Sequence, residues 1–347
     1  MIVQKDNKAY SYFIFGLRLQ CNLKIPRLVE CEATSKPDVM IWLDTIPPWL
    51  GEFPEESHKV SYISEYREYD GKPSFTVWKL GGGKFYRLLY ADGTEFFMDR
   101  QGTQIWATWP ASASIEDTAT YLLGPVLGDV LRLRGRTLLH GSAIVFNDQA
   151  FALVGPPGAG KSTLAAAFAK RGYPVLSEDV LPISKRDSAF VIDSGYPNIC
   201  LWPTAVKYLF GFSDALPRIT PADGASAWWD KRYLDLTKDG YRFPQKSHPL
   251  AAIYILGERR DNPMVSFVES LSANDGLMAL IANTYGISSL DIAGQAQDLK
   301  LLGRVAARVP IRRVSVQEGH DNIPTLCDSI LGDFRVITSS SHVMRLF

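Results

Sequence analysis

The chain has few cysteines, no excess of charge of either sign and no long apolar run. Its 347 residues include four cysteines, and its 37 basic residues match its 37 acidic residues, so the formal net charge is zero. The cysteines are scattered without C-x-x-C spacing, which argues against a disulfide framework and against a zinc site. Zero net charge provides no overall attraction to nucleic acid or to an anionic membrane, so we expect neither as a partner.

The sequence also lacks the signals of export and membrane insertion. No apolar run approaches the roughly 18 residues that a membrane-spanning helix requires. Residues Met1–Tyr10 include Lys5, Asp6 and Lys8 and contain no apolar core of signal-peptide length. We therefore expect a cytoplasmic protein. A hydrophobic fraction of 46% and a length of 347 residues are sufficient for two globular domains.

Residues 1–112 are predicted to form a β-rich N-terminal domain with a docking or regulatory role. Apolar segments alternate with turn signals such as Ala91–Thr94 and Asp99–Gly102, as in a meander of antiparallel strands. Five of the eight tryptophans lie in this part, namely Trp42, Trp49, Trp78, Trp106 and Trp109. They either fill the core of a small β-sheet or line a groove that docks a peptide, and the sequence leaves both interpretations open.

Residues 113–347 are predicted to form a second domain of alternating strands and helices. Pro110–Ser114 has the composition of a linker, and Ser114 can cap a helix that runs from Ile115 to about Leu133. Further strands are expected at Thr137–Phe146, Ala150–Val154, Tyr173–Leu176, Ala251–Leu256 and Ile311–Val316, and further helices at Leu164–Lys170, Asn274–Thr284, Gln295–Arg308 and Ile323–Leu331. The polar segment 211–248 is expected to be irregular.

The most informative stretch of the second domain is a glycine-rich loop between a predicted strand and a predicted helix. Its residues are Gly155, Pro156, Pro157, Gly158, Ala159, Gly160, Lys161, Ser162 and Thr163. They fit the phosphate-binding pattern G-x-x-x-x-G-K-[ST], in which backbone N–H groups and the helix dipole converge on a polyphosphate. We expect Lys161 to reach the β- and γ-phosphates of a nucleoside triphosphate and Ser162 to ligate Mg²⁺.

Two adjacent acids, Glu178 and Asp179, are expected at the end of the strand that follows the phosphate-loop helix. In an open α/β sheet the strand ends converge beside the phosphate site, where Mg²⁺ requires carboxylates. We assign Asp179 to the metal together with Ser162, and Glu178 to the acceptor hydroxyl as general base. The reverse assignment is also compatible with the sequence, and solvated turn residues are the alternative for both acids.

Three further residues are candidates on weaker grounds. His140 lies in the predicted hairpin strand next to the phosphate-loop strand and is either a structural or a catalytic histidine. Lys231 and Arg232 belong to the long polar segment and either contact the γ-phosphate, as arginine fingers do, or form a solvated charge pair. The other histidines, which have no acids at metal-ligand spacing and are predicted to lie at the surface, are His58, His248, His320 and His342.

These features in combination resemble the catalytic domain of HPr kinase/phosphorylase. They resemble still more its homologues that are encoded beside lasso-peptide genes. The match covers roughly residues 137–181. The features that carry it are His140-Gly141, the hairpin, the phosphate loop, the helix ending at Arg171-Gly172, and the acidic pair Glu178-Asp179.

The resemblance implies an α/β P-loop catalytic domain of the HPr kinase/phosphoenolpyruvate carboxykinase-like class, acting as a serine kinase that uses ATP and Mg²⁺. In that family the histidine and the first acid of the pair handle the proton of the acceptor serine. Those roles would fall on His140 and Glu178, with Asp179 at the metal. The family carries aspartate at the first acid, and Glu178 is one methylene longer.

We therefore hypothesise an ATP-dependent kinase that phosphorylates a serine hydroxyl of a peptide or small protein, with lasso-peptide maturation as the setting that the resemblance suggests. Two alternatives stay open. One is a P-loop nucleotide-binding regulator or ATPase, and the other is a small-molecule kinase. The sequence does not determine the oligomeric state.

Overall fold

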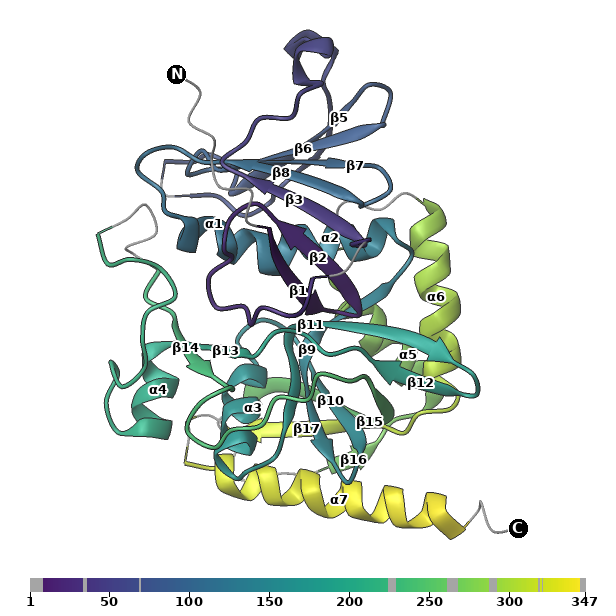
Figure 1. Cartoon of the computed structure of the whole chain (residues 1–347). Helices are drawn as coiled ribbons and strands as arrows, with labels where there is room; N and C mark the ends of the chain where they lie inside the picture. Colours follow the sequence, from purple (N-terminus) through teal and green to yellow (C-terminus); the bar gives the residue numbers. More distant parts are fainter. Residues whose placement is uncertain are drawn as a thin grey trace. The chain divides into compact units, whose positions relative to one another are not determined.

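The structure is a computed structural model that describes residues 9–33, 36–68, 70–223, 229–260, 268–286, 292–317, 319 and 321–343 (Figure 1). The chain forms two compact units, each with its own β-sheet. Unit 1 consists of residues 1–135, 219–230 and 286–291, and unit 2 of residues 136–218, 231–285 and 292–347. Across the described part of the chain, every helix is too short or too polar to span a lipid bilayer.

Unit 1 is built on an eight-stranded sheet with the spatial order β1-β2-β3-β8-β7-β6-β5-β4. The pairs β2–β3 and β3–β8 are parallel, and the other neighbours are antiparallel. The strands are β1 (Tyr10–Ile14), β2 (Leu17–Cys21), β3 (Val39–Leu43), β4 (Lys59–Ile63), β5 (Phe75–Leu80), β6 (Phe85–Tyr90), β7 (Glu95–Asp99) and β8 (Gln104–Thr108). Two short helical turns, η1 (Leu50–Glu52) and η2 (Glu55–Ser57), precede β4.

Three helical segments follow one another directly after this sheet: α1 (Ile115–Tyr121), the π-helical η3 (Leu122–Val126) and α2 (Leu127–Leu133). Ser114 caps α1, because its hydroxyl accepts from the Asp117 N–H at 3.1 Å while the Asp117 carboxylate accepts from the Ser114 N–H at 2.8 Å. The predicted capped helix is confirmed. It belongs to unit 1, whereas the sequence-based boundary at residue 112 precedes it.

The tryptophans of unit 1 pack against one another and against neighbouring aromatic rings. Trp42 stacks on Trp106 with ring centroids 4.8 Å apart, and Trp49 stacks on Phe85 at 3.7 Å. Trp106 is fully enclosed, with 4% of its surface exposed. The core interpretation is therefore confirmed for Trp106, and docking of a peptide by the partly exposed rings stays a prediction.

Unit 2 contains a seven-stranded sheet with the order β10-β9-β11-β12-β15-β17-β16 and a separate two-stranded sheet, β13-β14. The strands are β9 (Thr137–Phe146), β10 (Gln149–Val154), β11 (Val175–Arg186), β12 (Ala189–Ile192), β13 (Asn198–Leu201), β14 (Arg232–Asp235), β15 (His248–Arg260), β16 (Val268–Ser270) and β17 (Ile311–Gln317). The predicted hairpin is confirmed, since β9 and β10 pair antiparallel. β15 pairs first with β12 and then, in parallel, with β10.

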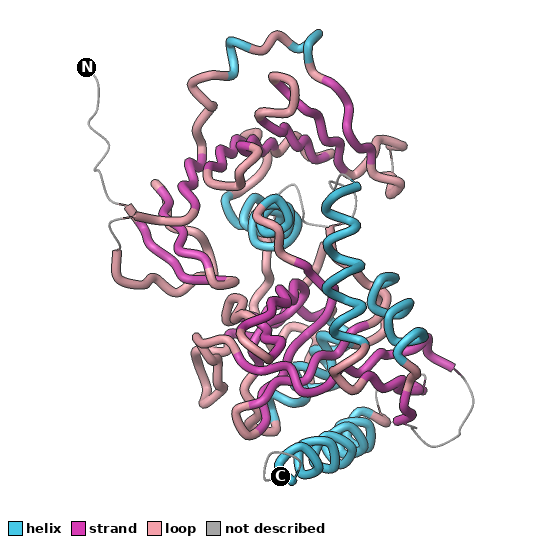
Figure 2. The backbone as a smooth tube through the Cα atoms, turned by 90° about the vertical axis from the view of Figure 1, so that its right-hand side faces the viewer, coloured by secondary structure: helices cyan, strands magenta, loops and turns pink. Residues whose placement is uncertain are grey.

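Helices cover both faces of the large sheet, and alternate residues of its strands enter two separate cores. In β9, Ile144 belongs to the core beneath α3 (Lys161–Lys170), α4 (Pro203–Phe210) and α7 (Ile323–Val343), whereas Ala143 and Val145 belong to the core beneath α5 (Ala273–Ala282) and α6 (Ile292–Ala306). Figure 2 shows α7 running along one side of the strands of unit 2.

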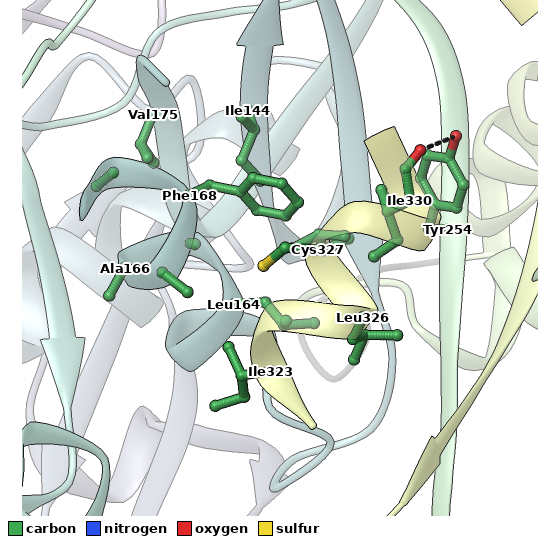
Figure 3. Close-up of a cluster of buried hydrophobic side chains, with 14 of the residues drawn as sticks. Ile144, Leu164, Ala166, Phe168, Val175, Tyr254, Ile323, Leu326, Cys327 and Ile330 are labelled. Atoms are coloured by element: carbon green, nitrogen blue, oxygen red, sulfur yellow. Dashed lines mark hydrogen bonds between the residues drawn. The ribbon is translucent and has the colours of Figure 1, made fainter. Parts of the chain in front are cut away.

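The core beneath α3 anchors the helix that follows the phosphate loop. Leu164 and Phe168 of α3 lie against Leu326, Cys327 and Ile330 of α7, all of them buried (Figure 3). Burial of aliphatic and aromatic side chains stabilises a fold by about 1.5–3 kcal/mol per residue. The start of α3, where Lys161 and Ser162 lie, is thereby held on a rigid support.

The structure is a mixed α/β protein with more than one sheet, as the sequence predicted, but several elements differ from the prediction. The strand expected at Tyr173–Leu176 is the much longer β11. Helix α4 has no counterpart among the predicted elements, and the segment 211–248 contains the strand β14. Residues 224–228 of that segment and His320 lie outside the described residues, as does the side chain of His342.

Candidate active site

The glycine-rich loop connects the end of β10 to the first residue of α3. Gly158 and Gly160 adopt left-handed backbone conformations, with φ of 81° and 97°, which side-chain-bearing residues rarely adopt. A Cβ atom on Gly155 would lie 2.7 Å from the carbonyl oxygen of Leu256 in β15. The loop therefore requires glycine at these three positions, and it leads into a helix N-terminus, where backbone N–H groups attract an anion.

Lys161 is buried inside this loop. Its ammonium group donates to the carbonyl oxygens of Gly155 at 2.8 Å and Pro156 at 2.9 Å. Burial lowers the pKa of Lys161, while the negative charges of Asp179 and Glu178 act in the opposite direction. The ammonium is thus held by the carbonyl groups of the loop and interacts electrostatically with both carboxylates.

Glu178 and Asp179 lie inside β11 rather than at the end of a strand. They pair in register with Ser142 and Gly141 of β9, after a register irregularity between Val175 and Ser177. Asp179 has a φ of 68°, a left-handed conformation that aspartate tolerates better than most residues and that re-aims a side chain at a bulge. The expectation of a strand end was wrong, because the chain continues through the site as a bulged strand.

Glu178 faces α3 and contacts the hydroxyl-bearing residue of the phosphate loop. The Ser162 hydroxyl donates to Oε1 of Glu178 at 2.6 Å. Glu178 is 5% exposed. Burial, followed by the negative charge of neighbouring Asp179, raises the pKa of Glu178 to about 7. The group is therefore close to half-protonated at neutral pH, and a cation beside it would favour its charged form.

Asp179 lies next to His140 of β9. Oδ1 of Asp179 is 3.2 Å from Nε2 of His140, and the carboxylate is partly exposed. Burial raises the pKa of Asp179, but the hydrogen bond and charge of His140, with the charges of Lys231 and Lys161, outweigh it and hold the pKa below its ordinary value. Asp179 is therefore an anion at neutral pH that is paired with an imidazole.

The two residues that we expected to bind the metal jointly, Ser162 and Asp179, contact different side chains. Ser162 contacts Glu178, and Asp179 contacts His140. Adjacent residues of a strand direct their side chains to opposite faces, so only one of the two acids can face α3. The face on which Glu178 lies was not predictable, because the bulge before it changes the register by one residue.

Two buried oxygen atoms support a cation site on the Glu178 side. Among the described residues, Oε2 of Glu178 and the hydroxyl of Ser142 are buried without a hydrogen-bond partner. The two residues are opposite each other on neighbouring strands, an arrangement that places side chains on the same face. Oxygen ligands are those that Mg²⁺ prefers, and buried polar atoms without a partner are rare, so these residues fit Mg²⁺.

A metal site made only of protein side chains usually has three or more ligands. The described residues contain no group of three or more His, Cys, Asp or Glu side chains that could form such a site. Mg²⁺ in phosphoryl-transfer sites is commonly held by one or two carboxylates together with substrate phosphates and water. Ser162 and Glu178 would hold it here.

Lys231 and Arg232 differ in their relation to this site. The Lys231 ammonium lies over the ring of Trp202, 5.3 Å from its centroid, and its charge acts on Glu178, Asp179 and Lys161. Arg232 begins β14, and its guanidinium donates to the carbonyl oxygen of Leu216 at 3.1 Å. The charge of Lys231 thus acts on the two acids, whereas Arg232 contacts the chain at Leu216.

Tyr285 belongs to the site and was missed by the sequence analysis. Its hydroxyl donates to Oδ2 of Asp179 at 3.3 Å. The residue follows α5, more than a hundred positions away from Asp179 in the chain. A single tyrosine after a helix carries no motif, so no signal in the sequence points to it.

Comparison with known proteins adds a weak structural likeness. No protein-family model matches the chain, and no characterised protein matches it in sequence. The HPr(Ser) kinase/phosphatase from Coxiella burnetii is similar in structure, with a TM-score of 0.32 and 11% sequence identity, over 60% of this chain and 97% of that one. A TM-score this low does not assign the chain to a family, so the function has to be inferred from the chain's own residues.

Proposed function

We propose that this protein is a serine kinase that transfers the γ-phosphate of ATP, with Mg²⁺, to a serine hydroxyl of a peptide or small protein. The observation that carries the proposal is the presence of two separate polar pairs beside one phosphate loop, Ser162–Glu178 and His140–Asp179. Phosphoryl transfer needs two such functions, a metal ligand and a group that orients or deprotonates the acceptor.

The phosphate loop binds the nucleotide. Its backbone N–H groups and the N-terminus of α3 receive the β- and γ-phosphates, and Lys161 exchanges its two carbonyl partners for phosphate oxygens. The charge of Lys231 reaches the two acids and adds positive potential where the terminal phosphate would lie. Charge of this kind stabilises the transition state of phosphoryl transfer.

Ser162 and Glu178 hold Mg²⁺. The chemistry that this ion supplies is neutralisation of charge on the β- and γ-phosphates. Glu178 is suited to this task because burial raises its pKa to about 7. The charged carboxylate is therefore unfavourable when no cation is bound, and a cation beside it stabilises the charge. This assignment reverses the one made from the sequence, where Asp179 was the metal ligand.

Asp179 and His140 receive the acceptor's proton. With its proton on Nε2, His140 donates to Asp179 and presents Nδ1 as an acceptor. As the oxygen of the serine forms its bond to the γ-phosphorus, the O–H bond breaks and the proton passes to the imidazole, while ADP leaves. Asp179 holds the ring in place and stabilises the imidazolium that results.

The proposal predicts opposite behaviour for two isosteric changes at adjacent positions. Glu178→Gln weakens binding of Mg²⁺ and ATP, whereas Asp179→Asn spares binding and lowers the rate of transfer about 10²–10⁴-fold, since Asp179 aligns the base, His140, and stabilises the imidazolium that forms in the transition state. Transfer is measured with γ-labelled ATP and a panel of serine, threonine and tyrosine peptides, and binding with a fluorescent ATP analogue.

Label that appears on serine peptides supports the proposal. ADP formation that depends on Lys161 but leaves every hydroxyl acceptor unlabelled favours the ATPase instead and overturns the kinase. If Asp179→Asn weakens Mg²⁺-ATP binding and Glu178→Gln does not, the roles of the two acids are the reverse of those proposed here.

A further inference from the structure

The carboxylate of Asp179 has a partner on each of its two oxygens. His140 holds Oδ1 at 3.2 Å, and the Tyr285 hydroxyl donates to Oδ2 at 3.3 Å. The Tyr285 ring also lies edge-on to the imidazole of His140, with ring centroids 6.0 Å apart. One carboxylate is thus held between two residues that come from different elements of unit 2.

The backbone around Tyr285 is fixed against the strand that carries His140. β10 pairs with β9 only as far as Gly141, where it leaves for the phosphate loop. Beyond that point the residues after α5 pair with β9 instead. The His140 N–H donates to the Asn283 carbonyl at 2.9 Å, and the Tyr285 N–H donates to the Leu138 carbonyl at 3.0 Å. Tyr285 is therefore built into the sheet beside the departing phosphate loop.

We propose that Tyr285 is a positioning residue of the active site, whose hydroxyl holds the Asp179 carboxylate in the orientation that aligns His140. A carboxylate with one hydrogen-bond partner can rotate about its C–C bond, whereas a second donor on the other oxygen fixes its plane. A donor to the charged form also stabilises that form. The inference rests on the proposed function for its catalytic consequence, but not for the hydrogen bond itself.

The groups that act electrostatically on Asp179 are known from the structure. His140 of β9, Lys161 of α3 and Lys231 before β14 are the positive or protonatable ones, and Glu178 is the neighbouring acid. Tyr285→Phe removes one donor and leaves all of these groups in place. The variant therefore isolates the hydroxyl from the charges around it.

The test is the steady-state kinetics of serine-peptide phosphorylation by the full chain, with kcat and KM for ATP measured separately. We expect kcat of Tyr285→Phe to fall about tenfold and KM for ATP to stay within twofold, because a misaligned base affects the chemical step and not the binding of the nucleotide.

Tyr254→Phe is the matched control. The Tyr254 hydroxyl donates to Oδ2 of Asp333 at 2.9 Å, so this variant also removes a phenol donor from a carboxylate of unit 2. It leaves kcat and KM for ATP unchanged. An unchanged kcat in Tyr285→Phe, a rise of KM for ATP as large as the fall of kcat, or the same loss in both variants overturns the inference.

A second readout is independent of catalysis. NMR signals of the His140 ring, identified with a His140→Gln variant, report the surroundings of the imidazole at a fixed pH in the absence of substrate. Ring signals that move in Tyr285→Phe but not in Tyr254→Phe support the role of Tyr285 even if no kinase activity is found. Unmoved ring signals overturn it even if the chain proves to be a serine kinase.

Discussion

Two buried clusters, one in each unit, contain different kinds of side chain. In unit 1 the rings of Trp42, Trp49 and Trp106 pack on one another, and Phe96 and Phe97 of β7 are both at most 1% exposed. In unit 2 the strands around the phosphate loop bury Glu178, Ser142 and the ammonium of Lys161. The first cluster consists of packed aromatic rings, whereas the second contains a carboxylate and an ammonium group, which are costly to bury.

The two kinds of buried side chain affect the stability of the fold in opposite ways. Aromatic packing contributes favourably to folding whether or not a ligand is bound. A buried carboxylate without full hydrogen bonding reduces the stability of the fold, and a bound cation or phosphate removes that cost. The buried groups that lower the stability of unit 2 are therefore those that we assign to the binding of ATP and Mg²⁺.

The largest effect is expected for Trp106→Ala in unit 1. Trp106 stacks on Trp42 and contacts Trp49 edge-on at 5.5 Å, so its truncation leaves a cavity and costs about 3–5 kcal/mol of unfolding free energy. Denaturant unfolding measures this loss, with Ile46→Ala, at a 64% exposed side chain, as a control that stays within about 0.5 kcal/mol. If Trp106→Ala weakened ATP binding by as much free energy as it removed from folding, the assignment of stability to unit 1 and of ligand binding to unit 2 would be wrong.

Gly141→Ala should produce a smaller loss, located in unit 2. A Cβ atom at this position lies 2.5 Å from the carbonyl oxygen of Leu153 and 2.7 Å from Cδ1 of Leu181. Because a backbone atom cannot move aside cheaply, we expect a cost of about 3 kcal/mol together with weaker ATP binding. Gly303→Ala is the matched control, since its Cβ atom meets nothing within 4 Å and helical alanine is favoured. Equal stability of the two variants would contradict the close approach of β9 to β10.

A pH-dependent effect is expected for Glu178→Gln. The pKa of Glu178 is about 7 in the folded protein and near its ordinary value when unfolded, so the stability conferred by its protonated form is complete at pH 4 and is lost as pH rises through 7. Relative to the unmodified chain, the variant, which does not titrate, should therefore gain about 3 kcal/mol of stability between pH 4 and pH 8. Unfolding curves at the two pH values, without nucleotide, provide the measurement. If the difference in unfolding free energy between the two proteins were the same at both pH values, burial would not raise the pKa of Glu178.

Much of this arrangement was predictable, and the unpredicted part has a physical cause. The strand-loop-helix around Gly155–Thr163 has a strong local pattern, and the capped helix at Ser114 follows from short-range hydrogen bonding. The side chain that Ser162 contacts depends on a bulge in β11. A bulge shifts every following side chain to the other face, and the sequence carries no strong signal for it.

Residues that reach the site from afar were equally hard to predict. Tyr285 and Trp202 approach it through pairing of segments far apart in the sequence, and such pairing depends on the whole sheet rather than on local pattern. Lys231 could be named as a candidate from its place in a polar segment. The sequence does not distinguish Lys231 from Arg232, and only the structure shows that the Arg232 guanidinium contacts the Leu216 carbonyl.

The smallest and most specific effect is expected for Lys231→Met. Under the proposed function the Lys231 charge acts on the terminal phosphate, so its removal should weaken ATP binding about tenfold, equivalent to about 1.4 kcal/mol, and ADP binding less than twofold. Because the ammonium rests on the 50% exposed Trp202, ATP should also alter Trp202 emission in the unmodified chain but not in Lys231→Met.

Two variants make this measurement specific. Trp202→Phe identifies the share of the emission change that belongs to Trp202 among the eight tryptophans. Lys170→Met removes a similar contact, an ammonium 4.7 Å from the centroid of Phe210, at the other end of α3 and should leave ATP binding unchanged. If Lys231→Met weakened the binding of ATP and of ADP equally, this lysine would stabilise the loop as a whole rather than contact the terminal phosphate. The segment that carries Lys231 would then contribute to folding and not specifically to ligand binding.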